Sequence, residues 1–236
     1  DLAERPSAEA FKAEAKKPYG IIAVAMGEGF SQIFRDLGVD VIVEGGQTMN
    51  PSTEDFLKAA EACSAEHLII LPNNSNIILA ANQAKEVSSL PMTVIPTKSI
   101  PQGIATLIEF DMEKSPEENE AAMTGATGNV KTLQVTYAVR DTQYGDLEIR
   151  KDDILGVGDG KIIAVGQAVE EVALESLDKL LDEDASIVTV YFGEEIKQED
   201  AEALLEKISA RYSGFDLDLE LHYGGQPLYY YVISVE

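Results

Sequence analysis

The 236-residue chain is predicted to be an α/β protein of two subdomains, a parallel sheet with helices on both faces followed by a mixed α/β sheet. Between residues 19 and 115, apolar runs of strand length alternate with helical stretches, the pattern of a parallel sheet covered on both faces. Beyond residue 129, consecutive strands follow one another through Gly-rich turns before the next helix, which indicates a mixed sheet. The expected boundaries are a linker at 1–18, the parallel subdomain at 19–128 and the mixed subdomain at 129–236.

The first subdomain is read from its apolar runs and its helix-capping residues. Residues 1–18 are polar and end at Pro18, so they are expected to form a linker with one short helix. Gly38 ends the first helix, Ser52 with Asp55 begins the second in a variant of the capping box, and Pro101 stands at the start of the fourth. Strands are expected at 21–25, 39–43, 67–71 and 92–95, with helices after 29, after 52, at 74–87 and from 101.

The second subdomain begins after a bridging helix at 116–129. Strands at 130–139, 154–157 and 162–165 are joined through turns at Gly145-Asp146 and Asp159-Gly160. A helix at 168–181, a strand at 187–192, a helix at 198–211 and strands at 217–223 and 228–235 complete the chain.

Composition excludes several classes of function. A formal net charge of −24 repels phosphate backbones and anionic lipid, so neither nucleic acid nor a membrane surface is expected as a partner. No apolar run reaches the roughly 18 residues of a membrane span. Cys63 is the single cysteine, which suits a reducing cytoplasm, and with two histidines it cannot complete the usual zinc ligand sets. A carboxylate-only Mg²⁺ or Ca²⁺ site stays open, although no metal ligands are assigned. The chain starts at Asp1 and is expected to be a piece of a longer polypeptide.

Residues 170–206 contain thirteen acidic residues against two lysines. They either form solvated helix faces or present a docking face to a basic partner.

Candidate ligand-binding residues lie in three loops that follow successive strands of the parallel sheet. Ligands bind at the carboxyl ends of such strands, where helix N-termini offer free N–H groups, so these loops predict a polar crevice that tolerates anions. The alternative is that the same side chains only cap helices and shape turns. The candidates are Gln47, Thr48, Asn50 and Ser52 in the first loop, Asn73, Asn74 and Asn76 in the second, and Thr97, Lys98 and Gln102 in the third.

Other motifs favour structural roles. Gly27-Glu28-Gly29 predicts a tight strand-to-helix turn, and Cys63 with His67 lacks an acid that would orient the imidazole. Arg140-Asp141 is interpreted as a local ion pair or a ligand contact, and Tyr229–Tyr231 as residues alternating across the last strand. We find no Gly-rich phosphate loop followed by Lys and Ser or Thr and no clustered Asp motif, so no catalytic residue is predicted.

The runs at 45–53, 71–76, 96–103, 135–141 and 224–229 resemble the carboxy-terminal region of bacterial fatty acid kinase A subunits, of the dihydroxyacetone-kinase-like family. The resemblance covers residues 19–236. It implies an ATP-dependent parent kinase of lipid metabolism whose amino-terminal domain, absent from this chain, binds Mg-ATP and phosphorylates a carboxylate. No cofactor is therefore expected here, and a homodimer of the parent stays open.

The order of the three loops is also similar to that of DegV-type fatty-acid-binding proteins, which are the kinase's partners. Gln47 and Pro51-Ser52 match the first loop of those proteins. Asn74-Ser75-Asn76 stands where they have Ser-Gly-Thr, and Pro96-Thr97 where they have Asp-Ser. This implies a two-lobed DegV-like fold whose carboxylate pocket, without its close-approach glycine, is rebuilt or lost.

The leading functional hypothesis is a non-catalytic docking module. It would bind a DegV-type fatty-acid-binding protein in the cytoplasm, so that the kinase domain of the same polypeptide forms acyl phosphate. A second hypothesis is a domain that binds a small molecule, a carboxylate, phosphate or fatty acid, in the crevice. The third is a glycerone-kinase-like phosphotransferase.

Overall fold

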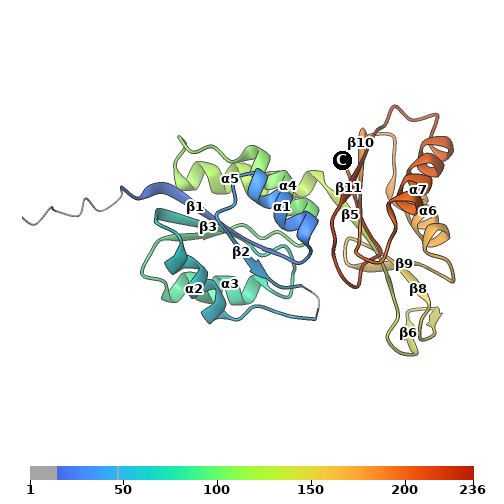
Figure 1. Ribbon diagram of the computed structural model, residues 1–236, viewed down its shortest axis with the longest axis horizontal. Coiled ribbons are helices and arrows are strands. Elements are labelled where there is room, and N and C mark those ends of the chain that lie inside the picture. The colour runs from blue at the N-terminus through green and yellow to red at the C-terminus, as the bar shows by residue number, and fades with distance from the viewer. Residues whose placement is uncertain (1–14, 47) are drawn as a thin grey trace, which may run out of the picture.

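The computed structural model describes residues 15–46 and 48–236 as an α/β fold built on two sheets. The first lobe carries a four-stranded parallel sheet and the second a mixed six-stranded sheet, and the two lie side by side (Figure 1). The predicted fold class is confirmed.

The first lobe has the strand order β2-β1-β3-β4, with every pair parallel. Its strands are β1 (Lys17–Ala25), β2 (Val41–Glu44), β3 (Ala65–Leu71) and β4 (Met92–Val94). The strand β1 starts four residues earlier than its apolar run suggests and takes in the end of the expected linker. The linker expected at 1–18, with its one short helix, lies mostly in residues 1–14, which are outside the described residues.

Helices cover both faces of the first sheet, because the strands place alternate apolar side chains on opposite sides. One apolar cluster joins Ile21 and Ala23 to α1 (Glu28–Asp36), α4 (Ile100–Glu109) and α5 (Pro116–Ala126). The other joins Ile22 and Val24 to α2 (Thr53–Ala62) and α3 (Ile78–Val87). Ser52 caps α2 and Asp55 completes the predicted capping box.

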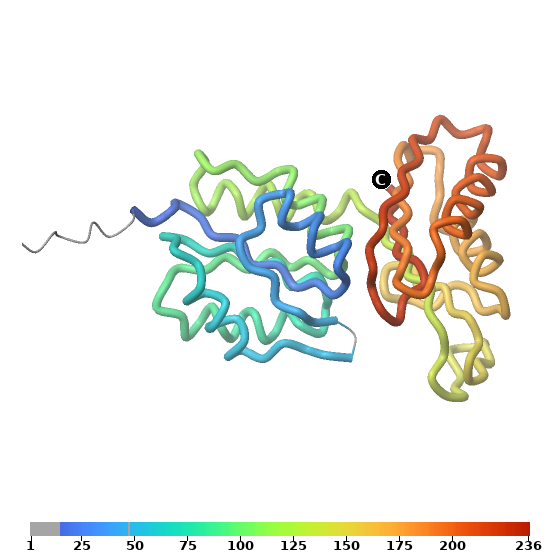
Figure 2. The backbone as a smooth tube through the Cα atoms, in the orientation of Figure 1, coloured from blue at the N-terminus to red at the C-terminus, as the bar shows by residue number. Residues whose placement is uncertain are grey.

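The second lobe follows the short 3₁₀ helix η1 (Thr127–Asn129) and has the strand order β11-β10-β12-β5-β8-β9. The helices α6 (Val169–Leu180) and α7 (Gln198–Arg211) pack on the face turned away from the first lobe (Figure 2). On the opposite face, Tyr191 and Val232 join the apolar cluster of α1 and α4. The two lobes therefore share this apolar cluster, which lies between them. The strands are β5 (Lys131–Tyr137), β8 (Ile154–Gly158), β9 (Lys161–Gly166), β10 (Ile187–Phe192), β11 (Asp218–Tyr223) and β12 (Tyr231–Val235).

A separate hairpin of β6 (Thr142–Tyr144) and β7 (Leu147–Ile149) projects from the second lobe beside β8 (Figure 1). The sequence indicated its Gly145-Asp146 turn but not its strands, which have three residues each. The last strand also starts later than predicted, so Tyr229 and Tyr230 lie in the loop before it and do not alternate across it. No helix of the described part of the chain is long and apolar enough to cross a membrane.

Candidate functional site

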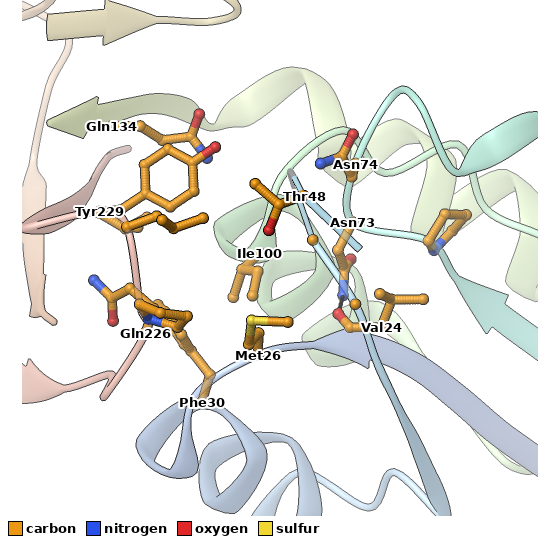
Figure 3. Close-up of a pocket in the computed structure, with 16 residues that line it drawn as sticks. Val24, Met26, Phe30, Thr48, Asn73, Asn74, Ile100, Gln134, Gln226 and Tyr229 are labelled. Carbon is orange, nitrogen blue, oxygen red and sulfur yellow. Dashed lines mark hydrogen bonds between the residues drawn. The ribbon is translucent and has the colours of Figure 1, made fainter. Parts of the chain in front are cut away.

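The site of greatest interest is a cavity of about 60 Å³ between the two lobes. The loops that follow β1, β2 and β3 and the start of α4 contribute its first-lobe side, and β5 with the loop before β12 contributes the other (Figure 3). Val24, Met26, Phe30 and Ile100 line it with apolar side chains. The predicted carboxyl edge of the parallel sheet therefore does face a cavity, and the second lobe closes it.

Asn73 is the best-anchored predicted residue at this cavity. Its backbone, at φ 56°, lies in the left-handed region that Asn tolerates better than most residues. Its backbone N–H donates to Thr97 Oγ1 over 2.9 Å, and its side-chain Nδ2 donates to the carbonyl oxygen of Val24 over 2.9 Å. These bonds tie the loop after β3 to β1 and to the loop after β4.

Gln226 occupies a similar position on the second lobe. Its Nε2 donates to the carbonyl oxygen of Tyr191 over 3.1 Å, and its own backbone carbonyl oxygen accepts the N–H of Glu194 over 3.1 Å. The side-chain oxygens of both amides, Asn73 Oδ1 and Gln226 Oε1, are buried and accept no hydrogen bond from the described residues. Each packs against a glycine, since a Cβ on Gly103 would lie 2.2 Å from the first and a Cβ on Gly224 2.1 Å from the second.

The polar groups at the cavity are uncharged. Asn74 contributes from the first lobe, and Gln134 and Tyr229 contribute from the second (Figure 3). Burial raises the pKa of the Tyr229 hydroxyl to about 12, so it is protonated at neutral pH and can donate. No described lining residue carries a formal charge.

A second, wider and more polar groove lies next to the cavity at the lobe junction. Lys98 and Lys131 both line it, with Asp159. The ammonium of Lys131 is bound to the carboxylate of Asp182 over 2.6 Å and to the carbonyl oxygen of Leu180 over 3.1 Å.

The predicted site residues are thus divided between several places. Thr48, Asn73 and Asn74 line the cavity, while Asn76, Lys98 and Gln102 line the groove together with Asn74. Thr97 is fully buried beneath Asn73, and Ser52 caps α2. Asn50 is exposed and lines neither space, and Gln47 lies outside the described residues.

Capping accounts for part of the polarity of these loops. Gln102 Oε1 accepts the N–H of Lys98 over 2.7 Å, and Asn74 Oδ1 accepts the N–H of Asn76 over 2.9 Å. Some of the side chains that line the groove therefore also cap a helix or shape a turn, which is the alternative interpretation of these loops.

The remaining motifs noted in the sequence form contacts within the fold. Cys63 ends α2, while His67 lies in β3 with its Nε2 2.7 Å from Thr93 Oγ1. The carboxylate of Asp141 accepts the N–H of Lys151 over 2.8 Å, so its partner is the backbone of the neighbouring turn.

Acidic residues of α6 form ion pairs with basic residues of α7. The carboxylate of Glu170 binds Lys207, and that of Asp178 accepts from Arg211 Nε over 2.9 Å. Within the described ranges, no three His, Cys, Asp or Glu side chains converge as they would to hold a metal ion.

Three polar residues of the cavity were not among the predicted site residues, because they come from the second lobe: Gln134, Gln226 and Tyr229. The signal that pointed toward them was the run 224–229, which contains two of the three. Its position beside the loops of the first lobe depends on long-range packing, which local patterns do not reveal.

Comparison with known families gives a match over almost the whole chain. The model of the FakA-like carboxy-terminal domain of fatty acid kinases matches residues 20–236. Protein YloV of Bacillus subtilis (strain 168) is 46% identical over 222 residues, which are 94% of this chain and 40% of that protein. A protein of Staphylococcus aureus (strain N315) is 44% identical over 216 residues, 92% of this chain and 39% of that protein. The chain thus spans about two fifths of the curated relatives it matches.

Solved structures with a similar fold have low sequence identity. A fatty-acid-binding DegV family protein from Thermus thermophilus superposes with a TM-score of 0.62 at 14% identity, over 93% of this chain and 99% of that one. Streptococcus pneumoniae Fak B3 loaded with linoleic acid superposes with a TM-score of 0.57 at 14% identity. The match covers 93% of this chain and 99% of that one. The dihydroxyacetone kinase of C. freundii with AMP-PNP and Mg²⁺ superposes with a TM-score of 0.59 at 15% identity. The match covers 93% of this chain and 48% of that one. These likenesses establish a DegV-like fold.

Proposed function

Because the chain belongs to the family of FakA-like carboxy-terminal domains of fatty acid kinases, we propose that it is the docking module of a fatty acid kinase. It binds an acyl-loaded DegV-type fatty-acid-binding protein and holds it beside a kinase domain of the same polypeptide. That domain phosphorylates the exposed carboxylate to acyl phosphate. The module contributes proximity, which can lower a barrier substantially without a catalytic group of its own.

The family match is the observation that carries this proposal. It covers residues 20–236, and the matched Bacillus subtilis relative is more than twice as long as the matched segment, since only 40% of it is covered. The remaining length of such a relative can accommodate a kinase domain that binds Mg-ATP.

The size and charge of the cavity argue against this chain holding the acyl chain itself. Its volume is about 60 Å³, whereas an engineered protein cavity of about 150 Å³ binds molecules of the size of benzene or xenon. Its described lining residues offer no cation to a carboxylate, and a buried ion without a partner is strongly disfavoured. A long-chain fatty acid therefore fits poorly in the cavity as it stands.

A competition assay tests the proposal. Full-length kinase forms acyl phosphate from ATP and the acyl-loaded DegV-type protein, and the isolated chain is added in increasing excess. We expect the chain to sequester the acyl-loaded protein and to slow the reaction, with recovery when more of that protein is supplied. An unrelated protein of similar negative charge is the control. An unchanged rate at large excess of the chain would contradict docking.

The two alternatives keep separate tests. The groove beside Lys98 is the feature that favours binding of an anion. Phosphate binding should be weakened by Lys98→Ala but not by Lys85→Ala on the outer surface of α3, whereas a general effect of charge would weaken it equally in both variants. A glycerone-kinase-like activity predicts ATP turnover by this chain alone with dihydroxyacetone.

A further inference from the structure

We propose that the cavity between the lobes is a binding site for a small uncharged molecule that has a short apolar end and an amide or hydroxyl group. The proposal does not depend on docking, because the site lies within this chain and needs no partner protein. It rests on the size, the charge and the hydrogen-bonding groups of the cavity.

Size limits the ligand to a few non-hydrogen atoms. The cavity measures about 60 Å³, less than half of the volume of an engineered cavity of about 150 Å³ that binds benzene or xenon. Met26, Phe30 and Ile100 provide an apolar surface that would cover the hydrocarbon end of such a molecule (Figure 3).

Charge excludes ions. The described lining contains no Lys, Arg, His, Asp or Glu, so neither a carboxylate nor an ammonium would find a counter-charge there. Bringing an unpaired ion out of water into a protein interior is strongly unfavourable. The net charge of −24 adds a long-range penalty for anions.

Hydrogen-bonding groups of the second lobe remain available. Tyr229 and Gln134 both line the cavity, and their side chains form no hydrogen bond with another of the described residues. Together they offer donors and acceptors that match the amide or hydroxyl of a ligand. Figure 3 shows both side chains on the side of the cavity opposite Asn74.

The backbone around the cavity is held in unfavourable conformations. Of the described non-glycine residues with positive φ, Asn73 at 56° and Leu228 at 69° both line it. Such conformations concentrate at ligand sites, where the surrounding structure maintains them. The left-handed conformation is especially costly for Leu, which has no side-chain group to compensate it.

The decisive experiment uses propionamide and propionate, which have nearly the same shape but differ in charge. Binding is followed by the shifts of the backbone amide signals of Ile100 and Tyr229 in a two-dimensional NMR spectrum of the isotope-labelled chain. We expect propionamide to shift both signals in a saturable manner and propionate to bind at least about tenfold more weakly.

A pair of matched variants locates the contact. Tyr229→Phe removes only the hydroxyl and should weaken propionamide binding about twofold to tenfold, the loss of one hydrogen bond. Tyr144→Phe, on the exposed β6 strand, should leave binding unchanged. The proposal is overturned if propionate binds as well as propionamide, if the two variants behave alike, or if only water occupies the cavity and propionamide causes no saturable shift.

Discussion

The backbone N–H of Phe30 donates a 2.9 Å hydrogen bond to the carbonyl oxygen of Gly224. This bond joins the first turn of α1 in one lobe to the end of β11 in the other. Gly27 and Gly29 flank the contact, and a Cβ on Gly29 would lie 1.8 Å from the carbonyl oxygen of Tyr223. The Gly27-Glu28-Gly29 motif, predicted as a tight turn, is therefore also a point where the backbones of the two lobes come into direct contact.

Replacing Gly29 by Ala should push the lobes apart. The added methyl group meets backbone rather than a movable side chain, so we expect a loss of about 1–3 kcal/mol in the free energy of unfolding. Denaturant unfolding measures this loss, and hydrogen exchange of the Phe30 amide shows whether the contact has opened.

Gly125→Ala is the matched control, because Gly125 also lies in a helix but has open space around its Cβ position. It should leave stability unchanged or raise it by up to about 1 kcal/mol. Equal effects of the two substitutions would contradict the close approach of the lobes.

Thr97→Val should destabilise the loop after β3. Thr97 is fully buried, and its Oγ1 accepts the backbone N–H of Asn73. Valine has nearly the same shape but leaves that buried N–H without an acceptor, at a cost of about 1–3 kcal/mol. Thermal unfolding compares it with Thr142→Val on the exposed hairpin, which should change stability little. A neutral effect at position 97 would mean that Asn73 is held by other contacts.

The stability of the chain should fall in acid partly through Asp153. The backbone N–H of Arg150 and then the side chain of Gln167 stabilise its carboxylate and lower its pKa below the usual value. A carboxyl group whose pKa is lower in the folded state than in the unfolded state stabilises the fold at pH values above its unfolded-state pKa of about 3.9. This stabilisation is lost as the pH falls through the folded-state pKa.

Asp153→Asn should therefore reduce stability near neutral pH and flatten its decline toward about pH 3. Urea unfolding at several pH values measures this slope, with Asp146→Asn at the hairpin turn as the control. An unchanged slope in Asp153→Asn would show that the carboxylate contributes nothing to folding.

The sequence predicted those features that depend on neighbouring residues. Ser52 and Asp55 define the start of α2 through a local capping box, and the apolar runs located each strand of the first sheet. Three-residue strands such as β6 and β7 are too short to show alternation, so only their turn was visible.

Long-range placement was harder to predict. Thr97 was predicted as a ligand-binding residue, and its structural role as the buried acceptor of the Asn73 N–H was not foreseen. Tyr229 was expected in a strand, but it lies in the loop that closes the cavity, because β12 starts only at Tyr231. The first relation arises where the loops after β3 and β4 meet within the first lobe, and the second where the second lobe packs on the first. Neither leaves a periodic signal in the sequence.

The most direct test of the docking proposal is a calorimetric titration of this chain with an acyl-loaded DegV-type protein. Docking predicts a saturable 1:1 complex with a dissociation constant of about ten micromolar or tighter, a range typical of a specific transient interface. Hydrogen exchange of the same mixture should show protected segments on this chain. The absence of both heat and protection at concentrations well above that value would contradict the proposal.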